Sequence, residues 1–360
     1  MPRARRGRLI LIDAHSLIYR AFFALPPMST TQGVVTNAVY GFTSMLAIVL
    51  ADRPEYAVAA FDVGRKTFRS EAYAAYKEGR RPMPDDLRVQ MDLVRDVLGS
   101  LTIPVYGIEG YEADDVIGTF ARQAEAAGAA VTIVSGDLDC LQLVTPAVEA
   151  MVPRRGITDT VSYGPDQVRQ RYGLEPRQLI DFKALRGDTS DNIPGVPGVG
   201  DKTATQLVQQ FGSVESLIEH LDELKEGRVK NALREASGRL PLMKRMVTIA
   251  TDVPVELDLQ RARWLSYDYD RAQAVFDGLE FRQLLARLPA PDQVPLQPTL
   301  DFEPVAATDV ILAGAADLGA VRAAVAAAPE VGVFGLWDGP ARGGRPVGLA
   351  LAAGEPAWYV

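Results

Sequence analysis

The stretch Arg8-Leu9-Ile10-Leu11-Ile12-Asp13 is a short apolar run that ends on a carboxylate. The pattern occurs twice more, in Tyr56 to Phe61 followed by Asp62, and in Ala130 to Val134 followed closely by Asp137. Helical patterns lie between these runs, which is typical of a mostly parallel sheet with crossover helices. Because open parallel sheets bind ligands beyond the carboxyl ends of their strands, we expect the three acids to converge on one crevice.

The composition is that of a globular protein with two or three domains. The chain has 360 residues, of which 48% are apolar and 23% charged, and this excludes a disordered or fibrous protein. Its formal charge of -8 gives no sign of a nucleic-acid partner, so the positions of the charges matter more than their sum. The single cysteine, Cys140, and two histidines leave little room for a disulfide or a zinc site, so we expect any metal ion to be held by oxygen.

We expect no export signal in the N-terminal residues. Met1 to Arg8 is basic, but the apolar run Leu9 to Ile12 stops at Asp13 and is too short for the core of a signal peptide. No stretch approaches the ~18 to 20 apolar residues that a membrane span needs. We therefore expect a cytoplasmic protein without a membrane partner.

Further elements follow from periodicity and from glycine and proline. The segment 187–200 is too rich in both residues for helix or strand, and helix is expected again to about Leu288. Five prolines between Pro289 and Pro304 mark a linker, and Val305 to Val360 resembles the beginning of another domain. The expected helices of the first part are Asn37 to Leu50, Asp85 to Leu98, Leu179 to Leu185 and Lys202 to Phe211.

Nine acids lie at strand ends or in compact motifs. In one crevice they would repel one another unless cations neutralised them, and an all-oxygen cluster suits Mg²⁺ or Mn²⁺ bridged to a phosphate. For any single acid, a solvated loop or a helix start is an equally good interpretation. EF-hand spacing and a G-x-G-x-x-G after the first strand are both absent from the sequence, which weakens the calcium and dinucleotide alternatives. The nine are Asp13, Asp62, Glu112, Asp114, Asp115, Asp137, Asp139, Asp188 and Asp191.

Three of these acids belong to one predicted helical turn. In Tyr111-Glu112-Ala113-Asp114-Asp115, opening a helix at ~100° per residue, Glu112 and Asp115 share a face and Asp114 lies beside it. The sequence therefore predicts that three carboxylates project from this turn toward the crevice.

A glycine loop precedes the predicted helix 202–211. Gly195, Gly198 and Gly200, followed by Asp201-Lys202, place unhindered backbone N–H groups at a helix N-terminus, where a nucleic-acid phosphate is favoured. The spacing is not that of a Walker loop. A plain tight turn between two helices is the alternative interpretation.

The segment 63–84 is basic and aromatic. Tyr73 and Lys77 stand four residues apart, as do Tyr76 and Arg80, so on a helix aromatic and cationic groups would share neighbouring faces. Such a mixture stacks on an unpaired base while it holds phosphates. An exposed, charged helix is the alternative.

These motifs closely resemble the flap endonuclease family, and within it the 5' nuclease (5'-3' exonuclease) domain of bacterial DNA polymerase I. The resemblance runs in order from about residue 8 to residue 288, and no carboxylate of the family pattern is missing. It is carried by Asp13-Ala14-His15-Ser16, Ala60-Phe61-Asp62, Phe68-Arg69 with Tyr76-Lys77, Tyr111-Glu112-Ala113-Asp114-Asp115, Gly136-Asp137-Leu138-Asp139 and Gly187-Asp188-Thr189-Ser190-Asp191-Asn192-Ile193-Pro194-Gly195.

The resemblance implies an α/β fold in two parts. A PIN-like, mostly parallel central sheet with a helical arch at about 63–84 would occupy residues 1–177. An α-helical DNA-binding subdomain with a helix-three-turn-helix motif would occupy residues 178–288. A Pro-rich linker at 289–304 would then lead to residues 305–360, the start of a 3'-5' exonuclease-like domain. The active versions of that domain carry Asp-x-Glu where this chain has Gly335 and Trp337, so we expect it to be inactive and incomplete.

The resemblance also implies roles for individual residues. The nine acids map to positions that hold two divalent ions, directly or through water. Lys77 and Arg80 map to arch residues near the scissile phosphate, and Arg20 and Arg69 to basic positions that handle substrate. Tyr76 maps to an aromatic position near the unpaired nucleotide. Gly195, Gly198, Gly200 and Lys202 fall in the duplex-binding hairpin, which in this family often binds a monovalent cation as well.

The implied function is a structure-specific 5' nuclease of DNA replication and repair. It would cleave DNA flaps, nicked 5' ends and RNA primers by two-metal hydrolysis, leaving a 5' phosphate and a 3' hydroxyl. Branched or flapped DNA, RNA-primed DNA, a DNA polymerase domain or polymerase, and DNA ligase are the implied partners. Two alternatives are a noncatalytic module that binds branched DNA and a PIN-type ribonuclease.

Overall fold

A six-stranded sheet forms the centre of the first of two compact units, which divide at residues 292 and 293. The computed structural model describes residues 7–291 apart from 65, 265 and 266, and then 310–312, 318–327, 332–338, 345–352 and 357–359. The strand order is β3-β2-β1-β4-β5-β6, and only β6 runs antiparallel to its neighbour. The strands are β1 (Arg8–Asp13), β2 (Tyr56–Ala60), β3 (Val105–Tyr106), β4 (Ala130–Val134), β5 (Val148–Arg155) and β6 (Asp159–Tyr163).

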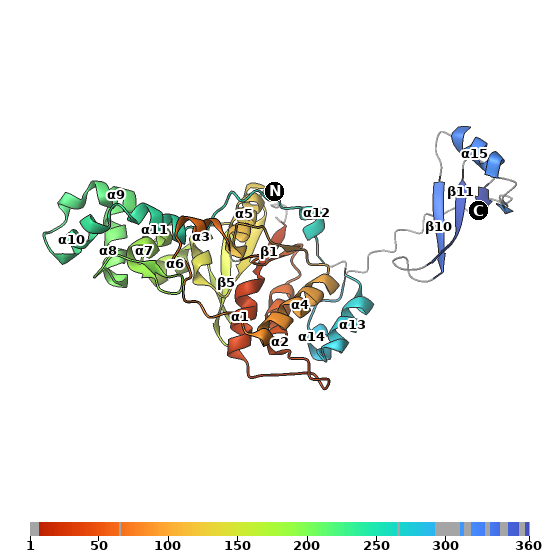
Figure 1. The fold of residues 1–360 in the computed structure, drawn as a ribbon, viewed down its shortest axis with the longest axis horizontal. Coiled ribbons are helices and arrows are strands. Elements are labelled where there is room, and N and C mark those ends of the chain that lie inside the picture. Colours follow the sequence, from red (N-terminus) through yellow and green to blue (C-terminus); the bar gives the residue numbers. More distant parts are fainter. Residues whose placement is uncertain are drawn as a thin grey trace, which may run out of the picture. The chain divides into compact units, whose positions relative to one another are not determined.

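Helices cover both faces of this sheet (Figure 1). One layer contains α5, and the other contains α1, α2, α4, α13 and α14. The helices of this part are α1 (Ala14–Ala24), α2 (Asn37–Leu50), α3 (Phe68–Ala72), α4 (Asp85–Ser100), α5 (Ala113–Ala126), the 3-10 helix η1 (Leu138–Leu143), α6 (Pro165–Tyr172), α12 (Leu259–Ala262), α13 (Tyr269–Gly278) and α14 (Arg282–Leu285).

Strand β1 shows why the continuous apolar run becomes a central strand. Leu9 and Leu11 enter the core on the α5 side, while Ile10 and Ile12 enter the core on the opposite side. All four are buried, because a parallel strand covered on both faces needs apolar residues at every position. Asp13 ends the run and is the residue that reaches the edge of the sheet.

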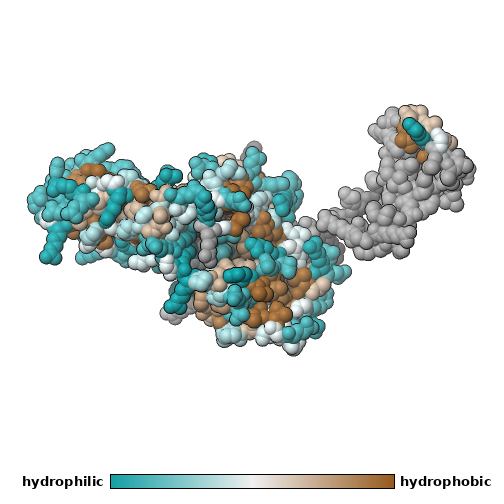
Figure 2. Space-filling model, in the orientation of Figure 1, coloured by the Kyte–Doolittle hydropathy of each residue, from teal (hydrophilic) through white to brown (hydrophobic). Residues whose placement is uncertain are grey.

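A helical subdomain, residues 178–247, lies at one end of the first unit (Figure 1). It packs on the α5 side of the sheet and shares that core. Hydrophilic side chains border its visible face (Figure 2). Its elements are α7 (Gln178–Arg186), the hairpin β7 (Gly187–Asp188) and β8 (Ile193–Pro194), α8 (Asp201–Phe211), α9 (Val214–Glu219), the 3-10 helix η2 (Leu221–Glu223), α10 (Arg228–Ala236) and α11 (Leu240–Val247).

The predicted fold class, a mostly parallel α/β sheet with a helical subdomain, is confirmed. Two local predictions were wrong. The loop 187–200 contains the short hairpin β7–β8, which its glycine and proline content concealed. The basic segment is helical only over α3, and residues 74–79 form turns with Lys77 in the left-handed region at φ 58°, so the proposed helical pairing of Tyr73 with Lys77 does not exist.

The second unit has a sheet of its own with the order β10-β11-β12-β9. Its elements are β9 (Val310–Leu312), α15 (Leu318–Ala327), β10 (Gly332–Asp338), β11 (Arg345–Ala352) and β12 (Ala357–Tyr359). Gly335 and Trp337 both lie in β10, while most of the predicted linker 289–304 falls outside the described residues. Among the described residues, none of the helices has the length and apolar character to cross a membrane.

One buried glutamine holds the start of α2 against α4, and its loss should be costly. The Gln90 Oε1 accepts hydrogen bonds from the backbone N–H groups of Ala38 and Val39, at 2.7 and 3.2 Å. Gln90→Leu leaves these buried helix-start donors without a partner, so we expect a loss of about 2–4 kcal/mol in the free energy of unfolding. Urea unfolding checks this, with the exposed Gln170→Leu in α6 as the matched control. Equal stability of the two variants would contradict this role of Gln90.

Candidate active site

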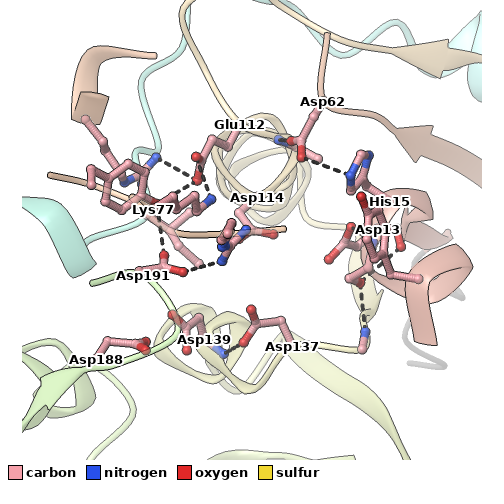
Figure 3. A pocket seen from close by; sticks show the side chains of 18 of the residues that line it. Asp13, His15, Asp62, Lys77, Glu112, Asp114, Asp137, Asp139, Asp188 and Asp191 are labelled. Atoms are coloured by element: carbon pink, nitrogen blue, oxygen red, sulfur yellow. Dashed lines mark hydrogen bonds and ion pairs between the residues drawn. The ribbon is translucent and has the colours of Figure 1, made fainter. Parts of the chain in front are cut away.

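Eight of the nine predicted carboxylates line a single cavity of about 610 Å³ in the first unit. They come from separate parts of the chain and face a common space (Figure 3). Asp13 ends β1, Asp62 follows β2, and Asp137 and Asp139 follow β4. The remaining four are Glu112 and Asp114 at the start of α5, Asp188 in β7, and Asp191 between β7 and β8. The parallel sheet and the helical subdomain together therefore build the acidic cavity.

Asp13 is fixed at the edge of the sheet by two serines. The Ser135 hydroxyl donates to its Oδ2 at 2.6 Å, and the Ser16 backbone N–H donates to its Oδ1 at 3.1 Å. Burial raises the pKa of this carboxyl, the serine hydrogen bonds oppose the rise, and the charge of Asp62 adds to it. The side chain is thus held in one orientation at an electrostatic cost.

Asp114 is buried among other acids of the cavity. Burial, and then the charges of Asp13, Asp137, Glu112 and Asp62, raise its pKa well above the ordinary value. Across the described part of the chain, no lysine or arginine forms an ion pair with Asp13, Asp114 or Asp137. This side of the cavity therefore lacks a positive charge of its own.

Four of the other acids have lysine or arginine partners. Lys77 Nζ lies 2.7 Å from the Glu112 carboxylate, and Arg80 binds Asp191. Lys183 of α7 bridges Asp139 and Asp188, with 2.7 Å between its Nζ and Asp188 Oδ2. We did not predict Lys183 from the sequence, although its place five residues before Asp188 was a usable signal.

The bridge of Lys183 leaves its two partners with different proton affinities. Burial and the charge of Asp137 raise the pKa of Asp139 to about 7, even with Lys183 beside it. Burial also raises the pKa of Asp188, but hydrogen bonds from Lys183 and Ser190 outweigh it and hold the value at about 2. Asp139 thus titrates near neutral pH, whereas Asp188 stays ionised.

Asp115, the ninth predicted ligand, does not reach the cavity. Its carboxylate is buried and accepts two hydrogen bonds from Arg69, each at 2.7 Å. It also accepts the backbone N–H of Glu112, because Glu112 is the residue that precedes α5 and the pair forms a capping box. Only Glu112 and Asp114 of this turn therefore point to the cavity, and the expectation of three projecting carboxylates was wrong.

Tyr76 is placed differently from its predicted role beside an unpaired base. Its side chain is buried, and its hydroxyl donates to Asp191 at 2.9 Å and to Glu112 at 3.1 Å. Burial and these two negative charges raise the pKa of the phenol, so the proton stays on Tyr76. In this structure the tyrosine joins two carboxylates and has little free ring face for stacking.

The remaining predicted residues lie outside the cavity lining: Arg20, Gly195, Gly198, Gly200 and Lys202. Arg20 donates to the carbonyl of Gly156 at 3.3 Å. Gly195 has a packing role, since a Cβ there would lie 2.1 Å from the carbonyl oxygen of Arg186. This close approach shapes the hairpin that carries Asp188. Gly200 and Lys202 stand at the start of α8, as expected.

The donor set of the cavity fits divalent cations. All of the predicted ligands supply oxygen, and burial together with neighbouring carboxylates raises the pKa values of Asp13 and Asp114, so a bound cation would favour their charged forms. Within the described residues, the structure contains no group of three or more Asp, Glu, His or Cys side chains that is already arranged to hold a metal ion. Binding would therefore draw the carboxylates together.

A carboxylate cavity at the edge of a parallel sheet, rimmed by Lys77 and Arg80, defines the class of metal-dependent enzymes that act on phosphate esters. Comparison with protein families specifies the class further. Residues 8–173 match the N-terminal resolvase-like domain of 5'-3' exonucleases, and residues 174–270 match their C-terminal SAM fold. The chain belongs to the 5'-3' exonuclease family, a family of nucleases.

The most similar curated relatives that we compared are bacterial DNA polymerases. DNA polymerase I of Bacillus caldotenax is 45% identical over 287 residues, which are 79% of this chain and 33% of the relative. DNA polymerase I of Bacillus subtilis is 45% identical over 284 residues, or 79% of this chain and 32% of the relative. The chain thus spans about a third of the length of these relatives.

Solved structures share the fold. The T5 5'-exonuclease with bound divalent metal ions (zinc) superposes with a TM-score of 0.57 at 21% identity, covering 78% of this chain and all (100%) of that one. The T5 flap endonuclease in a pseudo-enzyme-product complex with DNA and metal ions gives a TM-score of 0.55 at 20% identity, covering 78% and 99%.

The crowding around Asp114 predicts that its charge destabilises the metal-free protein. Because its folded pKa is raised above the ordinary value of 3.8, ionisation lowers stability as the pH rises above that value. Asp114→Asn should therefore raise the Tm at pH 8 in EDTA by about 2–4 °C, the shift expected for ~1 kcal/mol in a domain of this size. The gain in Tm on adding Mg²⁺ should shrink in the same variant. A lower Tm in EDTA would contradict this account.

Divalent-ion affinity should depend on pH. Protons compete with the cation at carboxyls that titrate near neutrality, and the pKa of Asp139 is about 7. We expect the affinity for Mn²⁺ to fall from pH 8 to pH 6 by up to about tenfold per unit for each proton displaced. Isothermal titration calorimetry in two buffers of different ionisation enthalpy measures both the affinity and the proton release. An affinity that is constant over this range would exclude the competition.

Proposed function

We propose that the chain is a structure-specific, metal-dependent 5' nuclease that cleaves DNA flaps and nicked 5' ends and removes RNA primers in DNA replication and repair. The observation that carries the proposal is the single cavity in which eight carboxylates face Lys77 and Arg80. The family of the chain and its identity to DNA polymerases support it. A module that only binds DNA would gain nothing from such mutual repulsion.

The donor set suits two divalent ions, Mg²⁺ or Mn²⁺. Asp13, Asp62, Asp114 and Asp137 would hold the first, because three of these four have no cationic partner among the described residues. The second ion would be held by the remaining acids, Glu112, Asp139, Asp188 and Asp191. It would compete for these carboxylates with their present partners Lys77, Arg80 and Lys183. When bound, such ions activate water and offset the negative charge that develops on the phosphodiester.

Lys77 and Arg80 supply positive charge to the substrate at the rim of the cavity. Both belong to the segment 63–84, and both now bind carboxylates of the cavity. A phosphate that entered the cavity would compete with these carboxylates for the ammonium group of Lys77 and the guanidinium group of Arg80. Both groups would stabilise the negative charge of the transition state. Tyr76 keeps its proton and holds Glu112 and Asp191 together on that side. The expected products carry a 5' phosphate and a 3' hydroxyl.

Duplex DNA would bind the helical subdomain. Gly198 and Gly200 precede α8, and the backbone N–H groups at the start of that helix suit a phosphate, with Lys202 adding charge. A monovalent cation at the hairpin is part of the proposal, although the carbonyl of Gly195 already accepts a hydrogen bond from Arg239 at 3.1 Å. We place the nuclease domain at residues 1–177 and the DNA-binding subdomain at residues 178–288.

The relatives suggest partners on the same DNA. Since they are DNA polymerases, we infer that the chain works with a polymerase domain or a polymerase, and that DNA ligase seals the nick it leaves. The place of action would be the nucleoid in the cytoplasm. Residues 305–360 are assigned no exonuclease activity in this proposal, because Gly335 and Trp337 stand at the positions of the acids.

Cleavage of a 5'-labelled double-flap DNA tests the proposal. Under single-turnover conditions we expect a defined short product with Mg²⁺ and none with EDTA, and Asp137→Ala should slow cleavage roughly a thousandfold while DNA binding persists. Asp166→Ala, at an exposed aspartate of α6, is the matched control. Binding without cleavage under Mg²⁺ and Mn²⁺ would favour the DNA-binding module. Cleavage of single-stranded RNA without an effect of the flap would favour the ribonuclease.

A further inference from the structure

Residues 246–250, here called the strap, form part of the cavity wall. Met246, Val247 and Ile249 line the cavity together with the carboxylates. The strap begins with the last two residues of α11, the last helix of the helical subdomain, and it leads back to the sheet. A movement of the helical subdomain would therefore be passed through the strap to the carboxylates at the edge of the sheet.

Arg69 and Asp115 hold the backbone of the strap. Arg69 Nε donates to the carbonyl of Met246 at 2.9 Å, and its Nη2 donates to the carbonyl of Thr248 at 2.7 Å. The Asp115 Oδ1 accepts the backbone N–H of Ala250 at 2.8 Å. Three alternate residues of the strap, Met246, Thr248 and Ala250, are thereby tied to α3 and α5.

Gln142 of η1 holds the same strap without touching a carboxylate in any contact that the structure records. Its side-chain amide donates to the carbonyl of Val247 at 3.0 Å and accepts the N–H of Ile249 at 2.9 Å. The glutamine is buried. It therefore offers a way to disturb the strap while leaving the charges of the cavity in place.

The same buried pair also orients Glu112. Asp115 Oδ2 accepts the Glu112 backbone N–H at 3.0 Å, and Arg69 Nη1 lies 3.5 Å from Glu112 Oε2. Glu112 in turn binds Lys77 and Tyr76 at the rim of the cavity. Arg69 and Asp115 thus contact the strap on one side. On the other side they contact Glu112, which binds Lys77 and Tyr76.

The hydrogen-bonding capacity of the pair is fully used inside the protein. The five N–H groups of a guanidinium meet five acceptor contacts at Arg69: two on Asp115, one on Glu112 and two carbonyls of the strap. Each Asp115 oxygen accepts two hydrogen bonds. With 3% and 0% of their side chains exposed, neither group has capacity left for a phosphate or a metal ion.

We propose that Arg69 and Asp115 are positioning residues that couple the helical subdomain to the cavity, so that duplex DNA seated on that subdomain sets the strap and Glu112 for cleavage. The inference rests on the proposed function. It replaces the substrate-handling role expected for Arg69 and the metal-ligand role expected for Asp115. Either residue acts through the strap and Glu112, and neither contacts the reacting atoms.

The test compares two variants that loosen the strap with one matched control. Gln142→Leu and Asp115→Asn loosen the strap. Gln123→Leu removes the same kind of buried contact from the segment that follows the strap. There the Gln123 amide donates to the carbonyl of Val255 and accepts the N–H of Leu257, each at 2.8 Å, outside the cavity lining. The main readout is the ratio of single-turnover rates on flap DNA and on single-stranded DNA of the same 5' sequence, and calorimetry gives the Kd of Mn²⁺.

We expect both strap variants to lower the ratio by about fivefold or more, the size of an ordinary coupling between sites, and Gln123→Leu to change it less than about twofold. The Kd of Mn²⁺ should change less than about threefold in all three variants, a change of under 1 kcal/mol. An unchanged ratio in Gln142→Leu overturns the inference, as does an equal loss in Gln123→Leu. A tenfold weaker Mn²⁺ affinity in Asp115→Asn with an unchanged ratio of rates also overturns it, because Asp115 would then act as a ligand and not through the strap.

Failure of the proposed function is separable from failure of the inference. The proposed function is overturned if the wild-type protein cleaves neither flap DNA nor single-stranded DNA, whether Mg²⁺ or Mn²⁺ is supplied. Hydrogen exchange then decides the inference, since binding of flap DNA should slow exchange at the amides of Ile249 and Ala250 in the wild type but not in Asp115→Asn. Equal slowing in both proteins, or no slowing in either, overturns the coupling.

Discussion

Repulsion among carboxylates is the constraint on which the rest of this structure depends. Eight acids share one cavity, and the pKa values of Asp13, Asp114 and Asp139 are all raised by burial and by their neighbours. Like charges at such distances are retained only where a rigid fold prevents them from moving apart. The central sheet provides that rigidity, because its strands are apolar on both faces and end at the cavity.

The fold divides the acidic cavity into two sides. On one side, serines and backbone N–H groups orient carboxylates such as Asp13, and their charge is left for a cation to neutralise. On the other side, Lys77, Arg80 and Lys183 already neutralise the acids. The cationic side chains come from the segment 63–84 and from α7, so the charge balance of the cavity depends on how these segments dock. Binding of an anionic substrate and binding of cations are thereby electrostatically linked.

The docking of distant segments follows from specific hydrogen bonds as well as from charge. Lys77 donates its backbone N–H to the carbonyl of Asp191 at 2.9 Å, and the side chain of Asn192 donates to the carbonyl of Ala75 at 2.7 Å. Lys77 and Asn192 both adopt positive φ, at 58° and 55°, a conformation that costs non-glycine residues free energy. Such strain is typical of backbone that a functional site constrains.

The sequence by itself determined the strands β1, β2 and β4, the helices α2, α4, α7 and α8, and the identity of the acids. Continuous apolar runs and strand-end acids such as Asp13 and Asp62 are local patterns, and local patterns are readable from spacing. Only the tertiary structure decided which neighbours those acids have. Asp114 and Asp115 are adjacent in the sequence, yet one faces the cavity and the other is enclosed by Arg69. The hydrogen bonds of Asp115 with Arg69 and with Ala250 of the strap, 135 residues further along the chain, settle this orientation. Lys183 and Tyr76 show the same limit, since their carboxylate partners meet them only once the chain has folded.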